Sequence, residues 1–111
     1  MSGFNYLRFL RKCQSKNYKI NLIYFWLYSP ELAIARVRQR VASGGHNIPE
    51  DTIIRRYHRG RKNLIESYIP LCDTWIIYNN SSFPPELVAT YNQQSKITLY
   101  SQEIWQKIHM S

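Results

Sequence analysis

Apolar residues along this chain follow helical spacing in some segments and form short continuous runs in others, which predicts alternating helices and strands. Residues 4–13 (FNYLRFLRKC) repeat apolar side chains at helical intervals with cations between them, which indicates an amphipathic helix. Residues 19–28 (KINLIYFWLY) are almost continuously apolar and rich in aromatic and branched side chains, which favours a strand covered on both faces. The run TWIIYNN at 74–80 predicts a second strand.

A helix with clear start and stop signals is predicted over 29–45. Ser29 suits the N-cap and Pro30 the first helical position. Gly44 and Gly45 are typical of a helix end, and they would also let the segment that follows hinge.

A second helix is expected to open at Pro49 and to run to about Tyr68, with Pro70 as its stop. A loop follows the second strand at 79–85. The tail is expected to form a short helix, a small strand and a final helix, at 85–91, 97–100 and 101–108.

This order predicts an α/β fold in which parallel strands are flanked by helices in three layers, with a helix pair between the two core strands. Two strands do not make a stable sheet. The tail must therefore supply a third strand, or further strands are missing.

The second predicted helix carries a one-sided stripe of cations. On a helical wheel of residues 53–69, apolar side chains cover one side and cations the other. The cations on the polar side are Arg55, Arg56, Arg59 and Lys62. Arginine meets phosphate oxygens with a planar fork of donors, so this face suits a phosphate clamp; the alternative is a solvated helix face. Arg61 falls on the apolar side and is expected to reach out past the core.

The overall charge points to an anionic partner. The chain has 111 residues, a net charge of +8 and 44% hydrophobic residues, which fits one small globular domain. Nucleic acid, phosphorylated small molecules and an acidic membrane face all match such a charge, as does a simple solvated surface. The run at 20–28 is too short to span a bilayer, and Cys13 and Cys72 are expected to be buried thiols, so we expect a cytoplasmic protein and no membrane.

A longer pattern is more specific than the charge. Residues 29–81 read SPELAIARVRQRVASGGHNIPEDTIIRRYHRGRKNLIESYIPLCDTWIIYNNS. The stretch resembles the C-terminal half of the zeta-toxin-like P-loop kinases, in particular the branch described as predicted ABC-type ATPases, whose members carry a GGHxIPxxxIxRRYxRGxxNL pattern. The segment before it resembles the same family, so the resemblance covers most of the chain.

The resemblance implies a P-loop kinase fold that binds ATP with Mg²⁺ and closes a mobile lid, here about 43–63, over the nucleotide. Lid arginines in that family neutralise charge during phosphoryl transfer, which makes Arg55, Arg56 and Arg59 the implied catalytic residues. The implied nucleotide-binding residues are Arg36, Arg40, Gly44, Gly45, His46, Asn79 and Asn80. A lone histidine after two glycines is otherwise more typical of a turn. Ile48 and Pro49 match the lid entry.

The chain departs from the family in what it lacks. It contains no GxxxxGK[ST] phosphate loop, and the family's first strands and acidic base are missing too. We therefore expect residues 1–111 to be a single incomplete domain that is inactive alone. Its expected partners are an N-terminal half encoded separately or an antitoxin-like protein.

Two other functions remain open. The Arg-rich helix and nine tyrosines fit a basic nucleic-acid-binding module, although no recognition motif is present. Alternatively, the chain is an interaction subunit that completes a partner's sheet, because the strand at 19–28 would leave an unpaired apolar edge.

Overall fold

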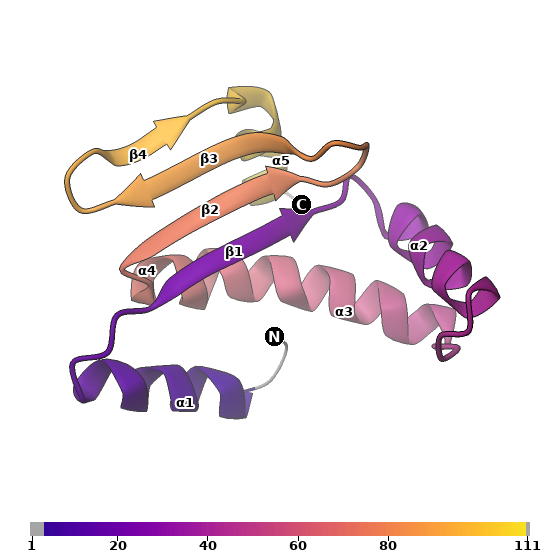
Figure 1. Ribbon diagram of the computed structural model, residues 1–111, viewed down its shortest axis with the longest axis horizontal. Coiled ribbons are helices and arrows are strands. Elements are labelled where there is room, and N and C mark those ends of the chain that lie inside the picture. Colours follow the sequence, from indigo (N-terminus) through magenta and orange to yellow (C-terminus); the bar gives the residue numbers. More distant parts are fainter. Residues whose placement is uncertain (1–3, 111) are drawn as a thin grey trace.

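The computed structural model describes residues 4–110, with side chains from residue 8 onward (Figure 1). The elements are α1 (Phe4–Ser15), β1 (Asn21–Trp26), α2 (Pro30–Ala42), α3 (Glu50–Asn63), η1 (Leu64–Tyr68), α4 (Ile69–Leu71), β2 (Thr74–Asn79), β3 (Glu86–Asn92), β4 (Lys96–Leu99) and α5 (Gln102–Met110).

The strands form one mixed sheet in the order β1-β2-β3-β4. β1 and β2 are parallel, with Asn21 opposite Thr74 and Trp26 opposite Asn79. β3 pairs antiparallel with β2, and β4 pairs antiparallel with β3. The α/β class and the helix pair between the parallel strands are confirmed (Figure 1). The expectation of parallel neighbours holds for β1 and β2 only.

The helix predicted over 85–91 is wrong, because this segment is strand β3. Pro85 and Glu86 imitate a helix start, but the residues after them pair with β2 through a bulge at Ile77 and Tyr78. Val88 and Ala89 are fully buried in that pairing. Tertiary pairing therefore overrides the local start signal, as it often does for short segments.

The small strand at 97–100 is confirmed as β4, and a tight turn connects it to β3. The Oδ1 atom of Asn92 accepts hydrogen bonds from the backbone N–H groups of Gln94 (3.0 Å) and Ser95 (2.6 Å). Lys96 closes the turn with φ 58°. The tail thus supplies two strands and completes a sheet that β1 and β2 could not form alone.

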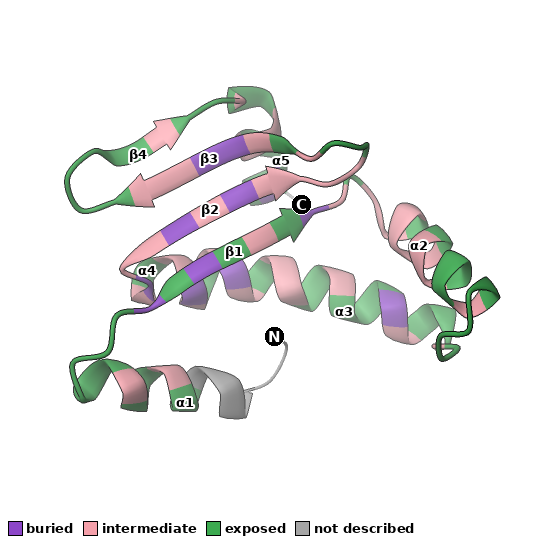
Figure 2. Cartoon of the chain, in the orientation of Figure 1, coloured by how far each residue is buried: buried purple, intermediate pink, exposed green. Residues whose placement is uncertain are grey.

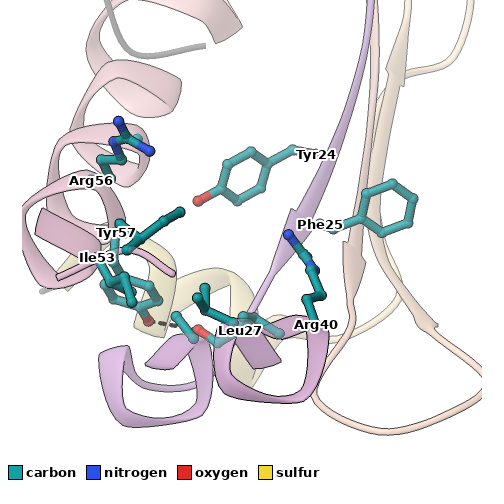
Figure 3. Close-up of a pocket in the computed structure, with 11 residues that line it drawn as sticks. Tyr24, Phe25, Leu27, Arg40, Ile53, Arg56 and Tyr57 are labelled. Carbon is teal, nitrogen blue, oxygen red and sulfur yellow. Dashed lines mark hydrogen bonds between the residues drawn. The ribbon is translucent and has the colours of Figure 1, made fainter. Parts of the chain in front are cut away.

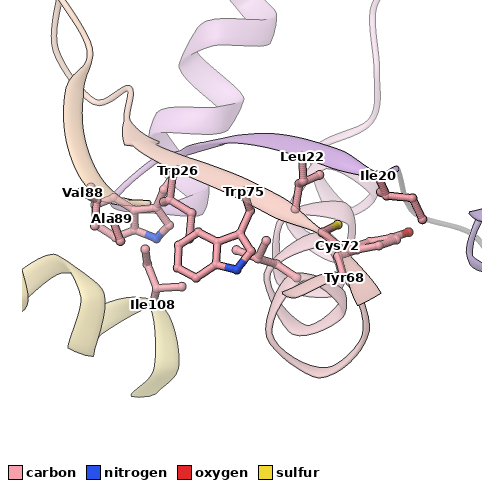
Figure 4. Packing of buried hydrophobic residues seen from close by; sticks show 11 residues of the cluster. Ile20, Leu22, Trp26, Tyr68, Cys72, Trp75, Val88, Ala89 and Ile108 are labelled. Atoms are coloured by element: carbon pink, nitrogen blue, oxygen red, sulfur yellow. The ribbon is translucent and has the colours of Figure 1, made fainter. Parts of the chain in front are cut away.

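The three-layer arrangement is not observed, because the hydrophobic core lies on one face of the sheet. Leu22 and Trp26 of β1 and Trp75 and Ile77 of β2 are buried on the face that the helices cover (Figure 4). On the other face, alternate β1 positions stay exposed: Ile23 is 57% and Phe25 53% exposed (Figure 2). Among residues 4–110 the fold therefore has two layers, helices on one side of a sheet.

Trp75 is the centre of this core. Its ring stacks against Trp105 of α5, with centroids 5.4 Å apart, and against Tyr91 of β3 at 5.9 Å. Ile108 of α5 is fully buried beside it (Figure 4).

Arg61 ties α3 to α5. Its Nη1 donates to the carbonyl oxygen of Ile108 at 2.7 Å, one of the last carbonyls of α5, where a cation is favoured by the helix dipole. The expectation that Arg61 reaches out past the core is therefore wrong.

The helix after α3 does not end before Pro70. It widens into the π-helical turn η1, in which the N–H of Ile69 bonds the carbonyl of Leu64, and then continues through Pro70 to Leu71. A wider turn removes the clash that a proline ring makes with the carbonyl four residues earlier. The same turn brings Leu64 and Tyr68 into the core.

Both cysteines are free thiols, Cys72 buried and Cys13 half-buried. Burial raises the pKa of Cys72 to about 11, so this thiol stays protonated near neutral pH. Within residues 4–110, no helix has the length and apolar character needed to cross a membrane.

Candidate functional site

A cavity of about 340 Å³ lies between the end of β1 and the helix pair α2 and α3 (Figure 3). Its polar lining consists of Arg40 from α2, Arg56 and Tyr57 from α3, and Tyr24 from β1. The other lining residues are apolar side chains and Gly60, and none is acidic. The cavity therefore combines apolar walls with two cations that no lining carboxylate neutralises.

Helical spacing brings the two arginines to this cavity. Ala33, Val37 and Arg40 share one face of α2, and Ile53, Arg56 and Gly60 share one face of α3. The apolar members of each stripe pack the helices together, so each arginine lies at the rim of that contact. An ion pair between Arg38 and Glu50 joins the two helices nearby.

Tyr57 fastens α3 to the end of β1. Its hydroxyl donates to the carbonyl oxygen of Leu27 at 2.6 Å (Figure 3). Burial raises the pKa of Tyr57, so the hydroxyl keeps its proton and remains a donor. On the helical wheel of residues 53–69, Tyr57 falls on the apolar side, and the structure places it there half-buried.

Tyr24 is a site residue that the sequence did not single out. It extends from β1 into the cavity, with its hydroxyl directed toward the α3 side (Figure 3). Burial raises the pKa of Tyr24 to about 12, and the neighbouring Tyr57 adds to the shift. A usable signal was its place near the carboxyl end of a parallel strand, where α/β folds bind ligands.

We expect the buried Tyr24 hydroxyl to make stability fall at alkaline pH. Because its pKa rises from 10.0 to about 12 on folding, its contribution is complete below pH 10 and is lost as the pH rises through 12. A shift of this size corresponds to at most about 2–3 kcal/mol. Urea unfolding of wild type and Tyr24→Phe at pH 8 and pH 11 tests this; an equal loss of stability in both proteins would contradict the assignment.

Gly44 and Gly45 cap the end of α2. The N–H of Gly44 bonds the carbonyl of Val41 (3.0 Å), and the N–H of Gly45 bonds that of Arg40 (2.6 Å), the pair that defines a Schellman motif. Gly44 has φ +99°, and a Cβ on Gly45 would lie 2.8 Å from the Arg40 carbonyl oxygen. The capping role expected of the glycines is confirmed, while hinging stays a prediction.

Gly45→Ala is expected to lower the free energy of unfolding by at least about 1 kcal/mol. The added Cβ would overlap the backbone carbonyl of Arg40, and relieving that overlap requires the helix end to shift. Gly60→Ala is the matched control. Its Cβ would enter open space within a helix, so it should be neutral or stabilising by about 0.5–1 kcal/mol. Denaturant titration measures both; equal effects would argue against the clash.

Of the other predicted lid residues, several lie outside the cavity lining. His46 is exposed in the loop after the glycine pair. Arg55 and Arg59 are exposed on α3 and do not line the cavity, whereas Arg56 does. The structure therefore brings together Arg40 and Arg56 and leaves Arg55 and Arg59 on the outer surface.

Arg36, Asn79 and Asn80 form a separate structural contact. Nη2 of Arg36 donates to the carbonyl oxygens of Asn80 (3.0 Å) and Ser81 (3.2 Å), which fixes the loop after β2 against α2. Oδ1 of Asn79 accepts from the N–H of Ser81 at 3.0 Å. Arg36 therefore fixes the loop that contains Asn80 and Ser81, and none of Arg36, Asn79 and Asn80 lines the cavity.

The residues around the cavity suit an anion better than a metal ion. Mg²⁺ prefers carboxylate and other oxygen ligands, and the lining offers no carboxylate. Over the described range 4–110 there is no group of three or more His, Cys, Asp and Glu residues that could hold a metal.

No protein-family model, curated protein or solved structure matches this chain.

Proposed function

We propose that this chain is the lid-bearing part of a zeta-toxin-like, ATP-dependent kinase and that it holds nucleotide phosphates between α2 and α3. One observation carries the proposal: Arg40 and Arg56, from two different helices, line one cavity that has no acidic residue in its lining. Two guanidinium groups with no competing carboxylate suit the spread charge of a polyphosphate.

The position of the cavity in the fold supports the same proposal. It lies at the carboxyl end of β1, beside the helix pair that crosses from β1 to the parallel strand β2. In open α/β sheets, ligands bind at the carboxyl ends of parallel strands. The apolar walls then leave room for the less polar part of a nucleotide.

The predicted arginines would have different parts in phosphoryl transfer. Arg56 reaches the cavity in this conformation, so it would bind phosphate in the ground state. Arg55 and Arg59 would need α3 to rotate before they could neutralise the charge of the transferring group. A lid that moves between such positions is common in kinases of this kind.

In this proposal the chain binds phosphates but does not turn ATP over by itself. No glycine-rich phosphate loop occurs in its 111 residues. That loop and the Mg²⁺ it organises position the transferred group, so another polypeptide segment must supply them for activity. The candidates are an N-terminal part encoded separately and a partner protein.

Calorimetric titration with adenosine, AMP, ADP and ATP, with and without Mg²⁺, tests the proposal. Affinity should rise with each phosphate, and adenosine should not bind measurably, because the cations carry the recognition. A coupled assay should detect no ATP consumption. Equal binding of adenosine and ATP would contradict the phosphate site, and turnover by the purified chain would contradict the need for a second segment.

A further inference from the structure

The outer edge of β1 presents backbone groups that have no partner strand. β1 ends the strand order, and the carbonyls of Ile20 and Trp26 point to β2, where they accept bonds from Asp73 and Thr74 and from Asn80. Since backbone polar groups alternate in direction along a strand, those of Asn21, Ile23 and Phe25 point the other way. No other described residue of the chain forms a hydrogen bond with these outward groups.

The two edges of the sheet differ in how they resist pairing. β4 has four residues and begins with Lys96, a short and charged edge that discourages association. β1 has six residues, NLIYFW, with no charge, proline or glycine, and its pairing with β2 has no bulge. An edge of the second kind adds strands readily unless a natural partner occupies it.

Tyr57 limits how far such pairing extends. The carbonyl of Leu27, the next outward group after Phe25, already accepts the Tyr57 hydroxyl at 2.6 Å. A strand added to β1 would therefore pair along Asn21 to Phe25 and stop where α3 is attached.

The segment that leads into this edge carries positive charge only, whereas Asp73, just before β2, accepts a hydrogen bond from the N–H of Ile20 on the inner side. The described chain from residue 8 to residue 28 contains no Asp or Glu and carries the cations Arg8, Arg11, Lys12, Lys16 and Lys19. Figure 1 shows α1, which carries three of them, on the β1 side of the molecule and away from β4. A second copy of the chain would bring the same cations to the edge, whereas an acidic segment would neutralise them.

We propose that the β1 edge binds an extended, acidic segment of a partner polypeptide, which adds a strand to the sheet along Asn21 to Phe25. Main-chain hydrogen bonds would give the affinity. The partner's central residues would be β-branched, to pack beside Tyr24 on one face and Ile23 on the other, and Asp or Glu would flank them. Tyr24 and Phe25 also line the Arg40 and Arg56 cavity. The edge would bind through main-chain groups and the cavity through guanidinium groups, so the two tests have separate readouts.

The direct test uses the peptide EEVTVTVEE and its charge-reversed twin KKVTVTVKK, with amide hydrogen exchange of the full chain as readout. The acidic peptide should slow exchange at Asn21, Ile23 and Phe25 by about tenfold or more when bound, because new hydrogen bonds protect these amides. The basic peptide should not. Equal protection by both peptides, or no protection by either, would overturn the proposal.

Ile23→Pro blocks the edge selectively. The Ile23 N–H points away from β2, so proline there removes an outward donor and leaves the β1–β2 ladder intact. We expect at least about tenfold weaker peptide binding by fluorescence anisotropy, against less than about threefold for the control Ile23→Thr. Unchanged binding by a folded Ile23→Pro protein would overturn the proposal. If that variant does not fold, the exchange pattern of the wild type decides.

Two other occupants have distinct signatures. Analytical ultracentrifugation should show a monomer without peptide. A dimer that Ile23→Pro abolishes would instead show that the edge binds a second copy of the chain, and would overturn the acidic partner. Single-stranded oligo-dT at about 150 mM salt should leave the three β1 amides unprotected, since nucleic acid contacts cations and not strand edges. Protection by oligo-dT in place of the acidic peptide would overturn the proposal.

Discussion

Trp75→Ala is expected to lower the free energy of unfolding by about 3–5 kcal/mol, enough to unfold much of the population of a small domain. Trp75 is 1% exposed and lies between the rings of Tyr91 and Trp105, so its removal leaves a cavity between β3 and α5. The sheet would lose its stacking contact with Trp105 of α5. Urea titration followed by far-ultraviolet circular dichroism measures the change.

Tyr18→Ala is the control for this substitution. Tyr18 is also aromatic but is 65% exposed, so we expect a loss within about 0.5–1 kcal/mol. If Trp75→Ala cost no more than Tyr18→Ala, the one-sided core around β2 would not be the main source of stability.

Replacing Arg40 and Arg56 by glutamine is expected to weaken ATP binding by about tenfold for each substitution, and by about a hundredfold together, because charge-assisted hydrogen bonds are lost. Both guanidinium groups line the cavity, and both are exposed at its rim, so the protein should stay folded. Arg56→Lys should restore only part of the loss, since lysine cannot bind phosphate with two parallel donors. Calorimetry with ATP measures all four proteins.

The matched control removes two positive charges elsewhere. Arg11→Gln with Lys12→Gln changes the net charge by the same amount on α1, which contributes no residue to the cavity lining. ATP binding by this control should stay within about twofold of wild type at 0.15 M salt, where distant charges are screened. A loss as large as that of the cavity variant would show that only net charge matters.

Strong local signals predicted the elements that the structure confirms. The capping residues of α2, the helical spacing of α3 and the apolar runs of β1 and β2 were each readable without tertiary information. β3 was misread because Pro85 and Glu86 look like a helix start, and pairing with β2 outweighs that signal. The uncovered face of the sheet was not readable either, since a continuously apolar strand gives no sign of which face is covered.

The candidate site was predictable only in part. The helical wheel identified one stripe of cations on α3. Of these cations, only Arg56 lies on the part of the helix that faces the cavity, and only Arg56 lines it. Arg40 reaches the cavity because α2 packs against α3, and Tyr24 reaches it from β1. Neither residue belongs to the cationic stripe, so the wheel could not identify them. Arg36 and Asn80 were grouped with the nucleotide site, yet they bond each other.

The central claim is that phosphates bind between α2 and α3 at Arg40 and Arg56. Nuclear magnetic resonance of the arginine Nε–Hε groups during titration with ATP tests it most directly, because each guanidinium reports its own contact. We predict large, saturating shifts of Arg40 and Arg56 with one common dissociation constant, and small shifts of Arg11. Shifts that do not saturate, or that are equal across Arg11, Arg40 and Arg56, would contradict the claim.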